Sequence, residues 1–405
     1  MDPAINPFAP GAGNQPPELT GRGVVLAETA VILERLRRRY SDRSQILIGL
    51  RGVGKTVLLN RIDRMARDLG FHSALLEAPE NRSLAELLAP ELRKLLLQLD
   101  MLEGAKDTAK RALGALRAFA SIFKISIGDV GVGVASAPGM ADSGDLGRDL
   151  TDLMTMVGEA AADKGTLVAI LIDEMQYLRE EDLAGLIAAL HRVSQRNLPL
   201  IVFGAGLPQL AGLMGNAKSY AERLFVFKEI GPLSRDDAIK ALEDPAERVG
   251  VRFLPEALDE ILNATAGYPY FLQEWGKHTW IKAQSTPITR DDAIAATPEA
   301  IRELDQSFFR VRFDRLTPTE REYLRAMAEL GPQSHRSGDI AAIMQRPVEQ
   351  VAPIRSKVIL KGMAYAPAHG DTAFTVPMFD EYMKRAIPVF TPRPPRPRKT
   401  SGTAA

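Results

Sequence analysis

The first 230 residues alternate between short apolar runs and longer stretches in which apolar residues recur every three or four positions. Apolar runs that end at a glycine or a carboxylate are typical of buried strands, and the longer spacing is typical of amphipathic helices. Strands that alternate with helices predict a parallel α/β sheet with helices on both faces. The pattern predicts strands at 45–49, 72–76, 167–172, 200–203 and 225–229, and helices at 55–69, 83–99, 103–123, 147–163 and 180–196.

Isoleucines and valines alternate with other residues from 124 to 135, on both sides of Gly128. This period-two pattern around a glycine predicts a β-hairpin. The hairpin belongs to an insertion near residues 100–145, because Thr56 and Asp173, which carry the motifs described below, lie far apart in the sequence. We interpret the insertion as a decoration of the sheet edge, with the binding of a partner protein as the alternative.

The pattern changes after residue 230. Residues 231–314 are helical throughout, and residues 315–388 predict three helices followed by a strand pair, which is the order of a winged helix-turn-helix. Residues 1–20 are rich in proline, glycine and asparagine and predict a flexible arm, and residues 389–405 predict a disordered basic tail. The predicted helices of the C-terminal module are 317–330, 337–345 and 348–361, and its strands are 363–367 and 372–376.

Composition excludes several classes of protein. The chain has no cysteine, so disulfides, thiolate catalysis and cysteine-ligated metals are impossible. Lysine and arginine total 51, as do aspartate and glutamate, which argues against coating of nucleic acid by bulk charge. The start of the chain lacks a signal-peptide pattern, and the uncharged stretch 197–217 is broken by prolines and glycines. We therefore expect a soluble cytoplasmic protein without a membrane partner.

Residues 49–56, GLRGVGKT, match the phosphate-loop pattern G-x-x-x-x-G-K-[ST] between a predicted strand and a predicted helix. The glycines let several backbone N–H groups point at phosphate oxygens, and the helix adds its positive amino end. The lysine reaches the terminal phosphates, and the threonine hydroxyl ligates Mg²⁺. The pattern predicts a site for ATP and Mg²⁺ formed by Gly49, Gly52, Val53, Gly54, Lys55, Thr56 and Val57.

The most apolar predicted strand, 167–172, leads into Asp173 and Glu174. In a phosphate-loop protein, an aspartate at such a strand end holds the Mg²⁺ shell, and the next glutamate can act as general base toward the attacking water. The pair therefore predicts a nucleotide hydrolase, with Asp173 as metal ligand and Glu174 as a catalytic residue beside Lys55. A helix-capping acidic pair is the structural alternative.

The segments GLRGVGKT, LVAILIDEMQYL, GAGLPQL and GYPYFLQEW together resemble the AAA+ and STAND-like P-loop ATPases, over roughly residues 16–386. The resemblance is nearest to the archaeal-type, origin-recognition-like branch with a C-terminal winged helix. It implies a P-loop NTPase sheet with a helical lid (231–314) and a winged helix, and an ATPase of low turnover that assembles with copies of itself.

The same resemblance implies roles for further residues. Arg22 precedes the helix that flanks the adenine, and Pro269 lies near the nucleotide at the start of a lid helix. Arg223 is the candidate arginine finger, entering the site from a neighbouring copy or moving within the chain, and Arg51 is the second candidate. The usual polar sensor is missing after the strand 200–203, where Gln209 is the substitute.

The function of the C-terminal module stays open between DNA and protein. Basic residues outnumber acidic ones, 13 to 8, over residues 316–405, so a recognition helix could contact double-stranded DNA. The alternatives are a STAND-like signalling ATPase whose winged helix contacts protein, and an adaptor that binds ATP without hydrolysis. The candidate DNA contacts are Arg346, Arg355, Lys357 and Lys361.

Overall fold

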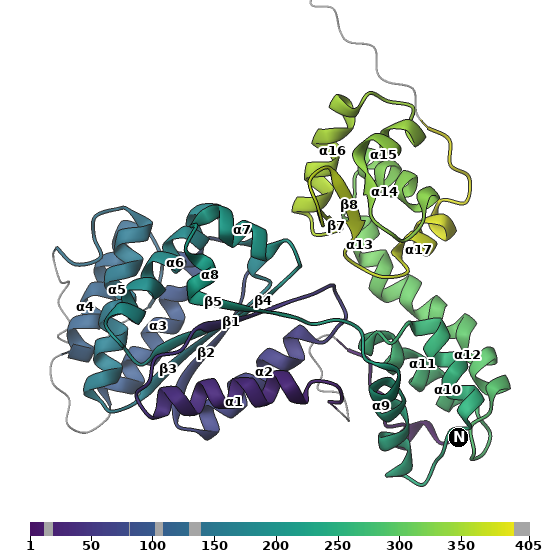
Figure 1. Ribbon diagram of the computed structural model, residues 1–405, viewed down its shortest axis with the longest axis horizontal. Helices are drawn as coiled ribbons and strands as arrows, with labels where there is room; N and C mark the ends of the chain where they lie inside the picture. The colour runs from purple at the N-terminus through teal and green to yellow at the C-terminus, as the bar shows by residue number, and fades with distance from the viewer. Residues whose placement is uncertain (12–18, 81, 102–107, 129–138, 393–405) are drawn as a thin grey trace, which may run out of the picture. The chain divides into compact units, whose positions relative to one another are not determined.

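The computed structural model describes residues 1–11, 19–80, 82–101, 108–128 and 139–392, and the chain divides into two units, Met1–Ala296 and Thr297–Ala405. The first unit is built on a parallel sheet with the strand order β2-β3-β4-β1-β5 (Figure 1). All neighbouring strands in it run parallel, so their carboxyl ends share one edge. The strands are β1 (Ser44–Ile48), β2 (Phe71–Glu77), β3 (Leu167–Asp173), β4 (Leu200–Gly206) and β5 (Phe225–Glu229).

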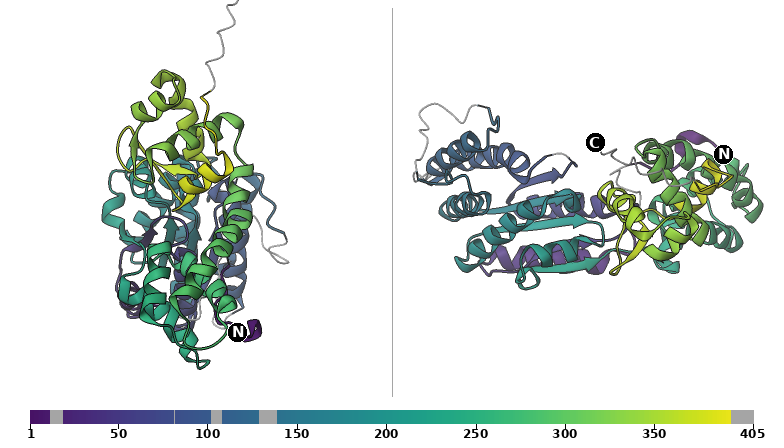
Figure 2. Two further views of the ribbon diagram at one scale, coloured as in Figure 1. Left: turned by 90° about the vertical axis from the view of Figure 1, so that its right-hand side faces the viewer. Right: turned by 90° about the horizontal axis from the view of Figure 1, so that it is seen from above.

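Both faces of the sheet are covered by helices, as the continuous apolar runs predicted. Successive strand residues point to opposite faces, so Ile46 and Ile48 join one buried cluster while Leu47 joins the other. Helices α1 (Gly23–Arg37) and α2 (Lys55–Asp68) supply the second cluster. The opposite face carries α3 (Leu84–Asp100), α4 (Thr108–Ile122), α5 (Leu146–Asp163), α6 (Glu180–Gln195) and α7 (Leu210–Ala217). The result is a three-layer α/β/α core (Figure 2).

The predicted hairpin at 124–135 is not a hairpin in its described part. Residues 125–128 form no strand, and Ile125 and Ile127 pack against the buried cluster of α3, α4 and α5. Alternating apolar residues thus find their burial against helices rather than through pairing with a second strand. Residues 129–138 lie outside the described residues.

Helices follow the sheet, as predicted for residues 231–314. They are preceded by the short turns η2 (Met175–Tyr177) and α8 (Ala221–Leu224) within the core. Trp275 and Trp280, both fully buried, form the centre of the helical part. Its helices are α9 (Arg235–Glu247), α10 (Pro255–Thr265), α11 (Pro269–Lys282) and α12 (Arg290–Glu303).

The first eight residues are packed, which corrects the predicted flexible arm for this segment. A short turn, η1 (Pro3–Ile5), leads to Phe8, which is 3% exposed and meets Phe253 edge to face. The Trp280 indole donates a hydrogen bond to the Asp2 carbonyl at 2.9 Å. The phenyl ring lies against Gly276, where any side chain would collide with it. One aromatic residue therefore anchors a segment whose composition resembles that of a linker.

The second unit begins at Thr297, earlier than the boundary predicted at 314/315. Its first segments, η3 (Leu304–Phe309) and α13 (Arg310–Asp314), pack on α17 (Phe379–Ala386), where Phe309 stacks on Tyr382 with centroids 5.2 Å apart. The predicted helices and strand pair are present, and β6 pairs with β8 as an additional strand. They are α14 (Pro318–Leu330), β6 (His335–Arg336), α15 (Ser337–Ile343), α16 (Val348–Leu360), β7 (Ala364–Tyr365) and β8 (Asp371–Phe374).

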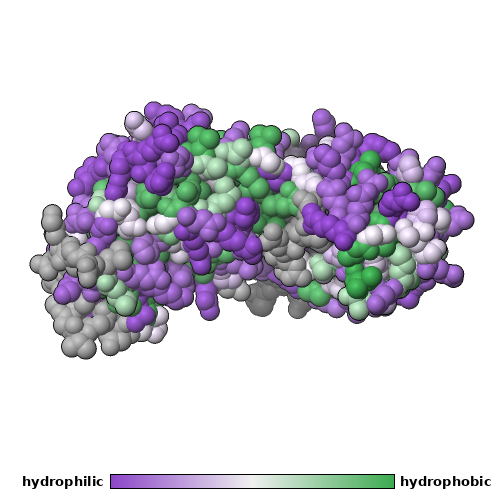
Figure 3. Space-filling view, turned by 90° about the horizontal axis from the view of Figure 1, so that it is seen from below, coloured by the Kyte–Doolittle hydropathy of each residue, from purple (hydrophilic) through white to green (hydrophobic). Residues whose placement is uncertain are grey.

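Apolar residues also reach the surface of the first unit. Figure 3 shows hydrophobic residues gathered on the side of the core that carries α1 and α2. On α1 these include Val24, 75% exposed, and Val31, 58% exposed, one heptad apart and so on one face of the helix. Within the described residues, no helix combines the length and apolar character that a membrane crossing requires.

Candidate functional site

The phosphate loop lies where the sequence predicted it, between β1 and α2 at the carboxyl edge of the sheet. Gly49 has no room for a side chain, because a Cβ there would lie 2.1 Å from the Ile230 carbonyl oxygen. Gly54, which precedes α2, has a φ of 92°, in the left-handed region that favours glycine. These two glycines let the loop turn tightly with its N–H groups directed inward at the helix amino end.

Lys55 lies inside the curl of the loop. Its Nζ donates hydrogen bonds to the carbonyls of Gly49 at 2.9 Å and Leu50 at 2.8 Å. Burial lowers the pKa of Lys55 to about 8, although the carboxylates of Glu174 and Asp173 act in the opposite direction. The ammonium therefore carries a charge at neutral pH in a place shielded from water, which suits the binding of phosphate oxygens.

The two predicted metal ligands meet. Thr56 Oγ1 donates a hydrogen bond to Asp173 Oδ2 at 2.5 Å, although the residues belong to different elements, α2 and the end of β3. Burial raises the pKa of Asp173, while the Thr56 hydrogen bond lowers it. A hydroxyl and a carboxylate in contact fit Mg²⁺, which typically takes one or two protein ligands beside phosphate oxygens. Among described residues, no cluster of three histidines or carboxylates offers another metal site.

Glu174 is held by Arg51, which the sequence named only as a possible arginine finger, and by Gln176, which it did not name. Its backbone has a φ of 54°, uncommon outside glycine and frequent at functional sites. Arg51 approaches both carboxylate oxygens at 3.4 Å, and the Gln176 amide also donates to this carboxylate. Gln176 in turn accepts a hydrogen bond from the Leu207 amide at 3.0 Å. The one sequence signal for Gln176 is that it is a polar residue close after Glu174 in the chain.

The start of α11 lies against the phosphate loop. The Tyr270 N–H donates to the Gly52 carbonyl at 3.2 Å, which brings Pro269 next to the loop. Arg22 directly precedes α1, as the sequence placed it. Its guanidinium is buried and donates to the carbonyls of Val53 at 3.0 Å and Gly231 at 2.6 Å. Burial lowers its pKa, and the charge of Asp237 partly offsets this. Arg22 thus joins the loop to the entry of the helical part.

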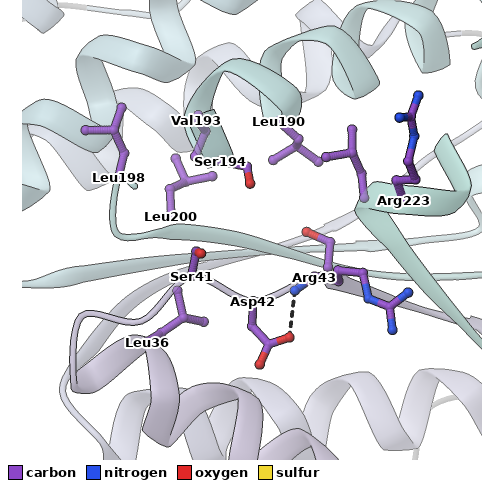
Figure 4. A pocket seen from close by; sticks show the side chains of 12 residues that line it. Leu36, Ser41, Asp42, Arg43, Leu190, Val193, Ser194, Leu198, Leu200 and Arg223 are labelled. Carbon is purple, nitrogen blue, oxygen red and sulfur yellow. Dashed lines mark hydrogen bonds between the residues drawn. The ribbon is translucent and has the colours of Figure 1, made fainter. Parts of the chain in front are cut away.

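Arg223 lies at the other end of the sheet. It precedes β5, which runs parallel to β1, so the length of a five-residue strand, about 13 Å, separates it from its own phosphate loop. There it lines a pocket at the amino ends of β1 and β4, together with Arg43 and several leucines (Figure 4). An arginine side chain cannot span that separation, so the structure excludes action of Arg223 on its own loop.

Three of the four candidate DNA contacts hold their own unit together. Arg346 forms an ion pair with the buried Glu322 at 3.0 Å. Arg355 donates to the Thr372 hydroxyl at 2.8 Å and to the Asp371 carbonyl, and Lys361 forms an ion pair with Glu320 at 2.7 Å. Lys357 is the exception: its side chain is exposed and makes no hydrogen bond or ion pair to any residue that the structure describes.

Comparison with known proteins assigns the core. Residues 18–203 match the family model described as AAA ATPase domain. This part of the first unit is therefore similar to an AAA ATPase domain. Residues 306–383, in the second unit, match a family described as a domain of unknown function (DUF8462). No curated protein matches the chain.

Solved structures are similar to this chain in fold. A Walker-type ATPase of Pyrococcus abyssi matches with a TM-score of 0.53 at 18% identity, covering 90% of this chain and 96% of that protein. The Orc1 protein of Aeropyrum pernix, solved in complex with DNA, matches with a TM-score of 0.48 at 15% identity, covering 91% of this chain and 94% of that protein. The RuvB Holliday junction branch migration motor of Thermotoga maritima matches with a TM-score of 0.45 at 14% identity, covering 94% of this chain and 100% of that protein. The Pyrococcus likeness shows a P-loop ATPase fold.

Proposed function

We propose that the chain binds ATP with Mg²⁺ and hydrolyses it slowly, as a switch that passes its nucleotide state to the C-terminal unit. The meeting of Lys55, Thr56, Asp173 and Glu174 at one edge of the sheet carries the proposal. The loop amides and Lys55 hold the phosphates, and Thr56 and Asp173 hold Mg²⁺, which when bound neutralises phosphate charge. Glu174 takes the proton from the attacking water.

Two substitutions test binding and hydrolysis separately. Lys55→Ala should weaken ATP binding by at least about 100-fold, because a buried charge-assisted contact is lost. Lys94→Ala, at an exposed lysine paired with Glu91 on α3, is the matched control and should bind normally. Unchanged ATP affinity in Lys55→Ala would remove the proposed site.

Hydrolysis distinguishes the switch from a binding adaptor. Glu174→Gln should retain ATP binding and lose turnover by roughly 100-fold or more, since a general base contributes about that much. Turnover is followed as phosphate release with excess ATP and Mg²⁺. If the unaltered protein releases no phosphate while binding ATP, the adaptor alternative replaces the hydrolase.

We propose further that Arg223 acts on the nucleotide of a neighbouring copy. Its place at the far end of the sheet supports this, because its own loop is out of reach. Arg223→Ala and Lys55→Ala proteins should each be inactive alone. Mixed together, they should recover part of the turnover, since one copy supplies the loop and the other supplies the arginine. No recovery at any ratio would contradict action between copies.

For the second unit we propose a winged helix-turn-helix that acts through contacts of α16. The order of α14, α15, α16, β7 and β8 supports the fold assignment. A DNA-associated role requires exposed cations, and only Lys357 among the four candidates has that property. The outer side of α16 also exposes Leu360 at 75%. This surface favours the alternative in which α16 contacts a protein.

A gel shift with and without ATP separates the two roles. A DNA-binding module should shift a duplex at low salt, with an affinity that falls steeply as salt rises. Lys357→Ala should then weaken binding, while Lys240→Ala on α9, at a distance in sequence from the module, should not. No shift with any duplex at low salt would leave the protein-contact role.

A further inference from the structure

Arg51 makes contacts that the proposed reaction does not require. It lies within the phosphate loop, and its guanidinium faces the Glu174 carboxylate, with one nitrogen 3.4 Å from Oε1 and another 3.4 Å from Oε2. The same side chain donates to the Tyr177 hydroxyl at 2.6 Å. With Gln176 also donating to Glu174, both oxygens of the proposed base are engaged. These contacts hold the Glu174 carboxylate toward Arg51 and Gln176.

The hydrogen-bonding capacity of the Arg51 guanidinium is nevertheless only partly used. Its Nε is buried and has no hydrogen-bond partner among the described residues. Its two contacts to Glu174 are at the long end of the hydrogen-bond range. An unpaired buried donor and two long contacts make this arrangement less stable than one in which the whole guanidinium fork is paired.

A triphosphate offers that better pairing. Arginine binds phosphate oxygens in a two-pronged manner, with shorter and stronger bonds than a long carboxylate contact provides. Because Glu174 is the residue that faces the terminal phosphate in the proposed reaction, a guanidinium paired with Glu174 already lies on that side of the loop. The diphosphate lacks the group that would compete for Arg51.

We propose that Arg51 is a latch on Glu174 that opens only for a triphosphate. Without one, Arg51 and Tyr177 keep the Glu174 carboxylate turned to the loop. When ATP binds, the guanidinium moves to the terminal phosphate and releases Glu174 toward water. Arg51 thus contacts the triphosphate when one is bound and holds Glu174 when none is, and the inference rests on the proposed ATP function.

The latch predicts a coupling between Arg51 and Glu174 that is specific to the triphosphate. Binding is measured for ADP and for a non-hydrolysable ATP analogue with an imido bridge, both with Mg²⁺, by calorimetry. Glu174→Gln should tighten analogue binding by about five- to tenfold, because Arg51 no longer has to leave a charged partner. ADP binding should stay unchanged. In an Arg51→Met background the same Glu174→Gln change should have no effect on analogue binding.

The double-mutant cycle of Arg51→Met and Glu174→Gln separates the latch from a simple effect of charge. Removal of one negative charge near an anionic ligand would tighten binding in both backgrounds, so equal effects with and without Arg51 would overturn the latch. Arg192→Met, at an exposed arginine of α6, is the control for loss of an arginine. In this background Glu174→Gln should still tighten analogue binding. If the unaltered protein binds neither nucleotide, the proposed function fails instead.

A second variant keeps both latch residues in place. Tyr177→Phe removes the 2.6 Å contact that steadies Arg51 and leaves the ring. It should tighten analogue binding about two- to threefold and leave ADP binding unchanged. Turnover should rise, and the KM for ATP should not rise with it. Weaker or unchanged analogue binding in a folded Tyr177→Phe protein would also contradict the latch.

Discussion

Replacement of Arg22 tests the connection between the phosphate loop and the helical part. The guanidinium donates to Val53 and Gly231 carbonyls at 3.0 and 2.6 Å and is only 8% exposed. Hydrogen bonds from charged groups contribute about 1.5–3 kcal/mol each, and the burial of the charge, which lowers the pKa of Arg22, offsets part of that. We therefore expect Arg22→Met to lower the free energy of unfolding by about 2–4 kcal/mol.

The loss should be visible in denaturation and in binding. Trp275 and Trp280 are buried in α11, the helix whose first turn contacts the loop, so their fluorescence reports unfolding of this region. Arg22→Met should also weaken ATP binding several-fold, since the Val53 carbonyl in the loop loses its partner.

A matched arginine and a conservative change sharpen the Arg22 test. Arg38 flanks the other end of α1 and pairs with Glu34 at the surface, so Arg38→Met should cost less than about 1 kcal/mol. Arg22→Lys should recover only part of the loss, because an ammonium lacks the planar fork that spans two carbonyls. Equal stability of Arg22→Met and Arg38→Met would refute the reasoning.

Three further changes test other features. Phe8→Ala should cost about 3 kcal/mol in urea denaturation, as for buried aromatic residues, whereas Ile5→Ala, at a half-exposed residue, should cost under about 0.5 kcal/mol. Gly49→Ala should cost about 1–3 kcal/mol and impair ATP binding, because its Cβ meets backbone, whereas Gly23→Ala, with open space around it, should be neutral or stabilising. ATP affinity should fall above about pH 8, where Lys55 loses its proton, and a constant affinity up to about pH 9 would contradict a role for its charge.

The core was predictable because its signals are local. A strand buried on both faces is a continuous apolar run, and the phosphate loop is a fixed spacing of glycines, lysine and threonine. Asp173 and Glu174 could be assigned because carboxyl ends of parallel strands share one edge of the sheet. Thr56 and Asp173 accordingly meet across the intervening strand β4.

Contacts between distant segments could not be predicted in the same way. Nothing in the sequence spacing shows that Arg51 contacts Glu174 and Tyr177. The arm was misread because its composition is that of a linker, whereas Phe8 alone supplies the burial that holds it on Gly276. The contacts of Arg51 with Glu174 and of Phe8 with Gly276 each join residues more than a hundred positions apart.

Within the described part of the second unit, the basic residues of the C-terminal end are largely balanced by acidic ones. Of the 13 basic residues after position 315, nine lie within the described residues, where they face eight acidic ones. Arg325, Arg346, Lys361 and Arg385 each form an ion pair with a carboxylate of the same unit. A cation that already neutralises a carboxylate adds little to the attraction of a phosphate backbone. Most of the surplus positive charge therefore comes from the four basic residues of 393–399. A DNA contact by this end of the chain would depend on them and on exposed cations without an ion pair to any described residue, such as Arg336, Lys357 and Lys384, rather than on a basic recognition helix.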